Sequence, residues 1–421
     1  MNLTINSKEK VLLAVVEYKR NGGLWTIEDT AREMEELVLA CHGEVVDKVF
    51  CRIDKPSATS LIGEGKVNEI AALAAAKGVD TVVFSHELKG SQQRNLEEII
   101  KAKTIDRTQL ILDIFARRAS SQEGRMQVEL AQLEYLLPRL VGKGIALSRL
   151  GGGIGTVGPG ETKLEVDRRR IGERVAKLKD DLKDVALARA TKRKKRKDQG
   201  IPLISLVGYT NAGKSTLLNT LTQAEQVTKD GLFTTLDSVS RQFSLPNHQK
   251  MVLSDTVGFI HELPHNLIEA FKATLEEVVE SDLLMHVVDV SHPKFRNLYD
   301  SVVSVLGQLD VAEKTVITVL NKIDRLEDKS SLPELEKMFP NSVSISALKG
   351  ERLAELLEKI GEMTASLILD VQVTLPIMRM DLINLAHKEG QVFSVKYYND
   401  KIFLHAALPH QLAGKFLKSS L

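Results

Sequence analysis

The sequence predicts an α/β protein in which a doubly wound sheet is preceded by a small α/β domain with a long helical hairpin and followed by a small α+β domain. Three observations predict this fold class. Short apolar segments alternate with helical segments in two regions, two long charged helical segments separate these regions, and a strand–turn–strand pattern follows them. Alternating strands and helices are typical of parallel sheets covered by helices.

The first α/β domain is expected over residues 1–120. Its first helix begins at Thr26, because Asp29 stands three residues later and completes a capping box. The expected strands are 11–16, 45–51 and 81–84, and the expected helices are 26–41, 67–77 and 92–101. The glycines and lysine of residues 62–66 partly match a phosphate-binding loop but lack its full spacing. A second nucleotide site there, for ATP, stays an alternative in spite of this.

The helical hairpin is expected over residues 121–199. Two charged helical runs, 122–140 and 162–197, flank the glycine-rich stretch Gly151–Gly160. Helices joined in this way predict an antiparallel pair with a flexible tip. The stretch also spells the dinucleotide fingerprint G-x-G-x-x-G. No clear strand precedes it and Pro159 interrupts a helix start, so we discount a Rossmann site.

Basic residues surround the tip and end the second helix. Those that flank the tip are Arg139, Lys143, Arg149 and Arg168–Arg170. Glycines expose their N–H groups, so such a tip can approach an RNA backbone while the arginines supply charge for its phosphates. For the run Lys192–Lys197 and for Arg174, an RNA contact and a solvated helix surface are equally good interpretations.

The doubly wound sheet is expected over residues 200–366 and the α+β domain over residues 367–421. The expected strands of the sheet are 203–207, 251–254, 284–289, 315–321 and 343–346. In the last domain, strands at 392–398 and 402–406 flank the turn Asn399-Asp400. This pattern predicts a small antiparallel sheet at the end of the chain.

A phosphate-binding loop follows the first strand of the doubly wound sheet and opens a helix. Its residues are Gly208, Tyr209, Thr210, Asn211, Ala212, Gly213, Lys214 and Ser215. The spacing lets backbone N–H groups surround the phosphates, Lys214 reach the β- and γ-phosphates, and the Ser215 hydroxyl ligate Mg²⁺.

A second motif ends the next strand of the same sheet. It consists of Asp255, Thr256, Val257 and Gly258. The Asp255 carboxylate is expected near the metal, and the Gly258 N–H is expected where a γ-phosphate would lie. Phe259 follows, in the place where many GTPases carry a glutamine that orients the attacking water. Because a phenyl ring cannot do this, the catalytic group comes from elsewhere, including a partner, or turnover is slow.

Two motifs further along predict recognition of guanine. They are Asn321, Lys322, Ile323 and Asp324, and then Ser346, Ala347 and Leu348. The Asp324 carboxylate can accept hydrogen bonds from guanine N1 and N2, which adenine does not offer. A backbone N–H of the last motif can meet guanine O6. All the motifs come in the expected order at strand ends of one sheet, so the sequence predicts GTP binding and hydrolysis.

The segment before Asp255 predicts a nucleotide-dependent switch. Its expected nucleotide-binding residues are Phe233, Thr234, Thr235, Leu236 and Asp237. One of the two threonine hydroxyls can complete the Mg²⁺ shell when a γ-phosphate is present. An ordinary polar surface loop is the alternative. His261 and His265 lack further ligands nearby and are not expected to hold a metal.

Composition and charge restrict the partners and the cellular location that the sequence predicts. The formal net charge is +1, so a nucleic-acid partner requires a local basic patch. Only Cys41 and Cys51 are present, and the first residues lack the apolar core of a signal peptide. No run approaches the about 18 apolar residues of a membrane span. We therefore expect a cytoplasmic monomer without membrane insertion, and a peripheral association with the membrane stays open.

The chain resembles the HflX family of translation-factor-related, ribosome-associated GTPases over nearly its whole length. The segments that carry the resemblance are Gln127–Leu133, Pro138–Leu140, Gly151–Gly160, Gly208–Thr216, Phe233–Asp237, Asp255–Ile260 and Asn321–Asp324. The hydrophobic Phe259 also matches the family. The GTPase motifs are shared by many families, whereas the block from Gln127 to Gly160 is more specific.

The resemblance implies a partner and a set of site residues. It implies binding to the large ribosomal subunit, through the hairpin and its glycine-rich tip, and separation of stalled or idle ribosomes. It also implies Ser215 and Thr235 as Mg²⁺ ligands, with GTP or GDP as the bound nucleotide. We expect hydrolysis to be stimulated by the partner. The alternative is a GTP-gated adaptor for a non-ribosomal protein or RNA, with the hairpin as a protein-binding arm.

Overall fold

The structure is a computed structural model that describes residues 8–19, 25–140, 159–198, 200–223, 233, 237, 239–247, 249–261, 272–309, 311 and 313–420. By their contacts these residues form two compact units. The first contains Phe233 and the residues up to Lys183, and the second contains the others from Asp184 onward. Within the described ranges, no helix is long and apolar enough to cross a membrane.

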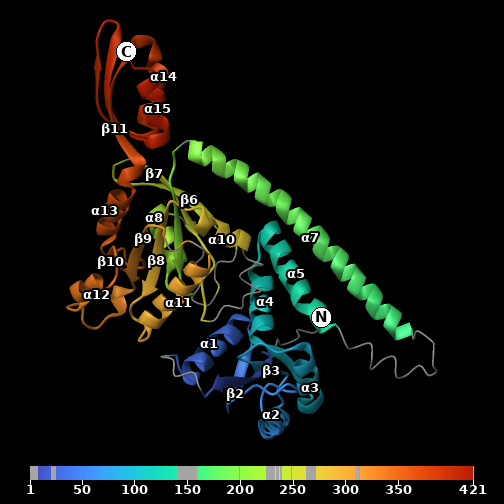
Figure 1. Cartoon of the computed structure of the whole chain (residues 1–421). Helices are drawn as coiled ribbons and strands as arrows, with labels where there is room; N and C mark the ends of the chain where they lie inside the picture. Colours follow the sequence, from blue (N-terminus) through green and yellow to red (C-terminus); the bar gives the residue numbers. More distant parts are fainter. Residues whose placement is uncertain are drawn as a thin grey trace, which may run out of the picture. The chain divides into compact units, whose positions relative to one another are not determined.

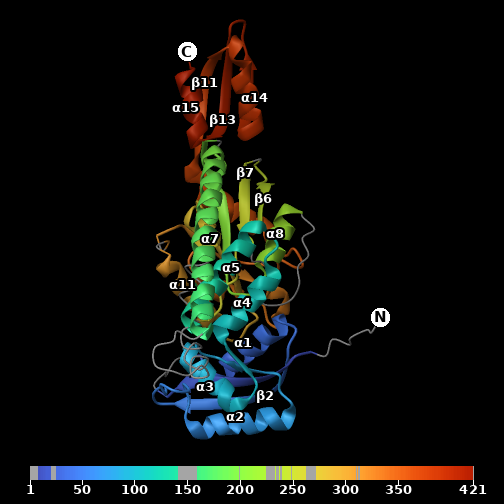
Figure 2. The same ribbon diagram turned by 90° about the vertical axis from the view of Figure 1, so that its right-hand side faces the viewer.

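The first unit contains a four-stranded parallel sheet in the order β2-β1-β3-β4. Its strands are β1 Lys10–Tyr18, β2 Glu44–Ile53, β3 Thr81–Phe84 and β4 Lys103–Asp106. Its helices are α1 Ile27–Ala40, α2 Glu64–Lys77, α3 Gly90–Ile100 and α4 Arg107–Arg118. The helices lie on both faces of the sheet, with α2 and α3 together on one face (Figures 1 and 2). The predicted α/β domain is therefore present.

Local signals explain where these elements begin and pack. Thr26 and Asp29 form the expected capping box at the start of α1. The four residues of β3 are all buried, as in a strand covered by helices on both faces. The sequence analysis missed β4, because its four residues, Lys-Thr-Ile-Asp, contain a single large apolar side chain and show no periodicity.

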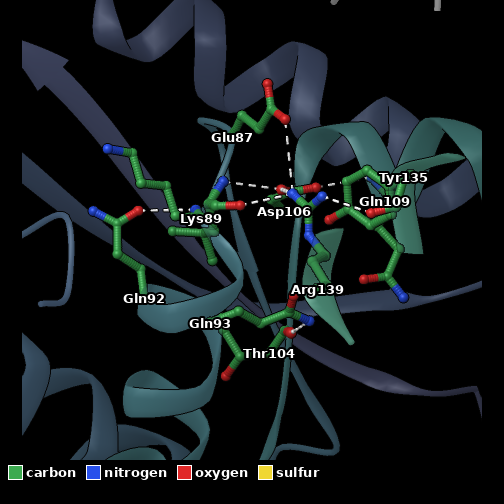
Figure 3. A network of polar contacts seen from close by, with 10 residues as sticks. Glu87, Lys89, Gln92, Gln93, Thr104, Asp106, Gln109, Tyr135 and Arg139 are labelled. Atoms are coloured by element: carbon green, nitrogen blue, oxygen red, sulfur yellow. Dashed lines mark hydrogen bonds and ion pairs between the residues drawn. The ribbon is translucent and has the colours of Figure 1, made fainter. Parts of the chain in front are cut away.

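A buried polar network joins the end of β4 to the end of helix α5 (Figure 3). Helix α5 spans Gln122–Leu136 and continues into the 3₁₀ turn η1, Leu137–Arg139. Asp106 caps α4 by accepting from the Gln109 N–H, and it also accepts from the Leu88 N–H. Arg139 donates to Asp106 and to the Leu88 carbonyl, and its guanidinium lies 3.4 Å from the centre of the Tyr135 ring.

This network changes the interpretation of Arg139. The sequence predicts a contact of Arg139 with RNA phosphates beside the glycine-rich tip, but its side chain is only 13% exposed and is held by Asp106. A guanidinium engaged with a fully buried carboxylate cannot leave without exposing that charge to an apolar interior. Arg139 therefore stabilises the first unit. The tip itself, through residue 158, lies outside the described residues, as do Lys143 and Arg149.

The hairpin helices are α5 and α7, which spans Pro159–Asp198. Both predicted helical runs are confirmed, and in the first unit α5 and the early part of α7 run in opposite directions (Figure 1). Arg174 makes two hydrogen bonds of 2.7 Å to Glu129, and Lys179 pairs with Glu134. These ion pairs favour the structural interpretation of Arg174.

The end of α7 belongs to the second unit. There Arg193 pairs with Glu276 of α10, Lys272–Val279, and Lys197 pairs with Glu280 just after it. Two basic residues of the run 192–197 therefore hold α7 beside α10. Lys194 and Lys195 of the same run are exposed.

The second unit contains a six-stranded sheet in the order β10-β9-β8-β5-β7-β6, parallel except for β6. Its strands are β5 Leu203–Gly208, β6 Val239–Ser244, β7 Lys250–Asp255, β8 Leu283–Asp289, β9 Val316–Asn321 and β10 Ser342–Ser344. Its further helices are α8 Lys214–Thr222, α11 Phe295–Gln308, α12 Leu332–Met338 and α13 Leu353–Thr364, with 3₁₀ turns η2 Ile323–Arg325 and η3 Ala365–Leu367. The predicted doubly wound sheet is confirmed.

The core of this sheet explains its strands. All six residues of β5 are buried, and Ile204 and Leu206 pack with Leu217 of α8 and Leu356 of α13 in one cluster. The sequence analysis missed β6, an edge strand paired only with β7, because most of its side chains are exposed and polar.

A three-stranded antiparallel sheet in the order β11-β13-β12 ends the chain. Its elements are β11 Ile368–Pro376, η4 Ile377–Arg379, α14 Met380–Glu389, β12 Gln391–Tyr397, β13 Lys401–Pro409 and α15 His410–Lys418. Alternate residues of β11 and β13 are buried with Ile383 of α14 and Phe416 of α15. The predicted small α+β region is confirmed, while the three boundaries between the four predicted domains remain predictions.

Candidate nucleotide-binding site

The phosphate-binding loop connects β5 to α8 and requires glycine at two positions. Gly208 and Gly213 have φ angles of +154° and +97°, which side chains rarely adopt. A Cβ atom at Gly208 would lie 2.3 Å from the Val287 carbonyl oxygen, and one at Gly213 would lie 2.3 Å from the Asn321 side-chain nitrogen. The loop thus lies directly against β8 and β9, where only glycine fits.

Lys214 is buried at the start of α8. Its Nζ donates to the Gly208 and Tyr209 carbonyls at 3.0 and 2.9 Å. Burial lowers the pKa of Lys214 to about 8, against the opposing effect of Asp255, and Lys322 lowers it further. An anion such as a phosphate, placed beside this ammonium, would raise the pKa and stabilise the charged form. The arrangement therefore suits phosphate binding.

Ser215, at the start of α8, and Asp255, at the end of β7, lie together. The Ser215 hydroxyl donates to the buried Asp255 carboxylate at 2.6 Å, although the residues are 40 positions apart. A hydroxyl and a carboxylate are hard oxygen donors of the kind that Mg²⁺ prefers, with phosphate oxygens and water as the remaining ligands. Among the described residues no group of three or more His, Cys, Asp or Glu side chains could hold a metal by itself. This pair fits a magnesium ion shared with a nucleotide.

Asn321 joins three parts of the site. Its side-chain nitrogen donates to the Ala212 carbonyl at 2.8 Å, and its side-chain oxygen accepts from the Ala347 N–H at 3.0 Å. The phosphate-binding loop and the last motif are therefore fastened to the end of β9. Both amide groups of Asn321 are used in the fold, so it positions the site.

Lys322 and Asp324 follow at the edge of the site. Lys322 has a left-handed backbone, with φ +68°, and its ammonium pairs with Asp289 at 2.7 Å. The Ser346 hydroxyl donates to the Asp324 carboxylate at 2.6 Å and lowers the pKa of Asp324. A carboxylate that is charged and held in this orientation can accept two N–H groups from one edge of a base.

Comparisons with known proteins identify the family. Three family models match in succession: "GTP-binding GTPase N-terminal" over residues 28–116, "GTP-binding GTPase Middle Region" over 118–196, and "50S ribosome-binding GTPase" over 203–322. GTPase HflX of Lacrimispora saccharolytica is 42% identical over 96% of this chain and 95% of its own length. GTPase HflX of Escherichia coli K12 is 42% identical over 82% of this chain and 81% of its own. The chain belongs to the HflX family of GTPases.

A solved structure is also similar to this HflX GTPase. It is a GTP-binding protein from Sulfolobus solfataricus in complex with GDP, with 26% identity and a TM-score of 0.43 over 85% of this chain and 99% of that one. The family membership shows that the chain is a P-loop GTPase. GTPases of this kind generally use Mg²⁺, in agreement with the oxygen donors at Ser215 and Asp255.

The first switch segment of this HflX GTPase lies mostly outside the described residues. Thr234, Thr235 and Leu236 are among the residues that the structure does not describe, so the Thr235 magnesium ligand stays a prediction. Phe233 is described, and its expected nucleotide contact also stays a prediction. Its ring is 1% exposed and packs edge-to-face on Phe115 of α4 in the first unit, with ring centres 4.7 Å apart. Burial of a phenyl ring in this way stabilises the first unit.

Several other expected nucleotide residues support the site from inside the fold. The Thr256 hydroxyl donates to the Leu206 carbonyl, while Val257 and Ile323 are buried apolar side chains. Leu348 is 73% exposed, and Asp237 is half-buried. Thr256, Val257 and Ile323 thus support the site by their burial, and the nucleotide contacts of all five residues stay predictions.

Sequence reasoning missed two residues near the site. Asp289 ends β8 and pairs with Lys322, and its position at a strand end beside β9 was the available signal. His286 of β8 is buried and stacks on Tyr299, with ring centres 4.6 Å apart. Burial lowers the pKa of His286 to about 3, with Lys214 contributing, so the neutral form of the ring is favoured.

Proposed function

We propose that this HflX GTPase binds the large ribosomal subunit and, in its GTP-bound state, splits or remodels stalled or idle ribosomes, with hydrolysis for release. The observation that carries this proposal is the match of residues 203–322 to a family described as 50S ribosome-binding GTPases, within family membership over nearly the whole chain. A ribosomal partner also implies a cytoplasmic protein.

The proposed nucleotide contacts follow from the site geometry. The loop from Gly208 to Ser215 would surround the phosphates, with Lys214 on the β- and γ-phosphates. Ser215 and Thr235 would hold Mg²⁺, which neutralises charge on the phosphates. Asp324 would select guanine, and the backbone of Ser346–Leu348 would meet guanine O6. The support is the convergence of these strand ends at one edge of the sheet.

The hydrolytic step is proposed to depend on the partner. Phe259 is 2% exposed and carries no polar group that could orient water. The backbone of Gly258 lies beside Thr210 and Lys214 of the phosphate-binding loop. In this position the Gly258 N–H would face the γ-phosphate. A group supplied or ordered by the ribosome would complete the site.

The proposed RNA contacts use the hairpin. Of the basic residues singled out in the sequence, Arg139, Arg174, Arg193 and Lys197 form ion pairs inside the fold. Arg168–Arg170 are exposed on α7 near the glycine-rich tip and supply charge for phosphates. The tip would insert into a functional centre of the large subunit.

Co-sedimentation with purified large subunits tests this function. With a non-hydrolysable GTP analogue the protein should pellet with large subunits, and with GDP binding should be weaker. Lys214→Ala should lose the nucleotide dependence, whereas Arg52→Met, at an exposed ion pair on β2, should behave as the parent. Large subunits should also accelerate GTP hydrolysis from a free rate below about 1 s⁻¹. A protein that never pellets, and whose turnover ignores ribosomes, would instead support the GTP-gated adaptor.

A further inference from the structure

The pairing of β5 with β7 continues past the end of β7 into the second switch. Leu206 pairs with Asp255 in the regular sheet, and three residues later Tyr209 forms a parallel bridge with Phe259. The second switch therefore contains one extra residue between the two pairings. The Thr210 N–H donates to the Phe259 carbonyl at 2.8 Å, and the Phe259 N–H donates to the Gly208 carbonyl at 3.1 Å.

The Tyr209 side chain extends this attachment by two residues. Its phenol oxygen accepts from the backbone N–H of His261 at 2.8 Å. Tyr209 is 9% exposed, and the intervening Phe259 and Ile260 are buried. The Tyr209 backbone is bridged to Phe259 and its hydroxyl is bonded to the His261 N–H. The tyrosine therefore links the phosphate-binding loop to residues 259 and 261 of the second switch.

The attached segment lies beside the residues that would hold the phosphates. A Cβ atom at Gly258 would lie 2.8 Å from the Thr210 methyl group and 3.1 Å from the Lys214 Nζ. The Gly258 backbone therefore lies close against the phosphate-binding loop, where a side chain would not fit. Any freedom at residues 259–261 would move Gly258 relative to Lys214.

We propose that Tyr209 is a positioning residue for GTP hydrolysis, and that it acts by holding the His261 N–H. Phe259 carries no polar group that could orient water, so the contribution of residues 258 and 259 to the reaction would come from their backbone groups, whose positions depend on contacts with the phosphate-binding loop. The Tyr209 hydroxyl adds such a contact through the His261 N–H. Loss of the hydroxyl should lower the rate of the chemical step more than it lowers nucleotide affinity.

Tyr209→Phe is the direct test, since it keeps the buried ring and the backbone bridge and removes the hydroxyl that accepts from the His261 N–H. Single-turnover hydrolysis with protein in excess should slow by about threefold to tenfold, the range expected for one neutral hydrogen bond. KM for GTP and the affinity for GDP should stay within about twofold of the parent on the same grounds. Amide hydrogen exchange of the 257–261 peptide should become faster.

Tyr299→Phe is the matched control, because Tyr299 is the only other tyrosine between residues 203 and 364. It should leave the single-turnover rate, the affinities and the exchange of residues 257–261 at parental values. The proposal is wrong if Tyr209→Phe hydrolyses GTP at the parental rate. It is also wrong if the GDP affinity falls as much as the rate, since the hydroxyl would then support the phosphate-binding loop as a whole.

Discussion

Asp324 keeps its negative charge to lower pH than a free aspartate, because the hydrogen bond from Ser346 lowers its pKa. We predict that Asp324→Asn weakens GTP binding by on the order of 2–4 kcal/mol, since a charge-assisted pair of hydrogen bonds is lost. The variant should favour xanthine nucleotides, whose edge is complementary to an amide. Competition between GTP and XTP measures both effects. Asp328→Asn, at an exposed carboxylate that caps Ser330, is the control and should retain the preference for GTP.

His286 makes the stability of the doubly wound sheet depend on pH. Burial lowers the pKa of His286 in the folded protein to about 3, with Lys214 contributing, from the ordinary value of 6.5. Between these two pH values the imidazole takes up a proton in the unfolded chain but not in the folded protein. Stability from this residue is fully present above pH 6.5 and should fall by up to about 1.4 kcal/mol per pH unit below it.

The pH dependence is measured by urea unfolding at pH 7.5 and pH 5.5, with hydrogen exchange of the β8 peptide as the probe. His286→Phe keeps an aromatic ring beside Tyr299 and cannot take up the proton. The loss of stability between the two pH values should therefore be smaller in the variant. Equal losses in parent and variant would show that other groups cause the acid sensitivity.

At the scale of elements, a buried ion pair joins α1 to α4 in the first unit. Arg107 donates to Glu33 at 2.6 Å, and the two side chains are 6% and 5% exposed. Arg107→Met leaves the Glu33 carboxylate buried without this guanidinium, and we predict a loss of about 3–5 kcal/mol in unfolding free energy. Adding Glu33→Met should recover most of the loss, because two apolar side chains of similar size need no charge compensation.

The single tryptophan, Trp25, precedes α1, so its fluorescence reports unfolding of the first unit. Arg52→Met is the matched control, because the Arg52–Glu17 pair is exposed and should contribute only about 0–1 kcal/mol. A double variant no more stable than Arg107→Met alone would indicate that packing, and not the buried charge, causes the effect.

At the scale of the whole molecule, the proposed function gives the nucleotide site control of timing and the hairpin the contact with the ribosome. We predict that replacing Gly151–Gly160 by a short Ser-rich linker leaves GTP binding intact and abolishes subunit separation. Serine side chains prevent the close approach of backbone N–H groups to RNA that glycines permit. Light scattering of intact ribosomes, with GTP affinity measured in parallel, follows both properties. Separation at the parental rate would make the tip a passive connector.

The sequence by itself determined the order of the domains and the motifs of the nucleotide site. Parallel strands place their carboxyl ends at one edge of a sheet, so apolar runs ending in Gly208, Asp255 and Asn321 predict a shared site. Ser215 and Asp255 do meet there at 2.6 Å. The short or polar strands β4 and β6 escaped prediction, because their side chains carry no clear periodicity.

Only the tertiary structure decided which partner each polar or aromatic side chain takes. Arg139 pairs with Asp106 across 33 positions, and Phe233 packs on Phe115 of α4. The Tyr209 hydroxyl meets the His261 N–H across 52 positions. Local spacing in a sequence encodes secondary structure and the direction of strand ends, whereas burial and hydrogen bonding between distant segments depend on how the elements pack.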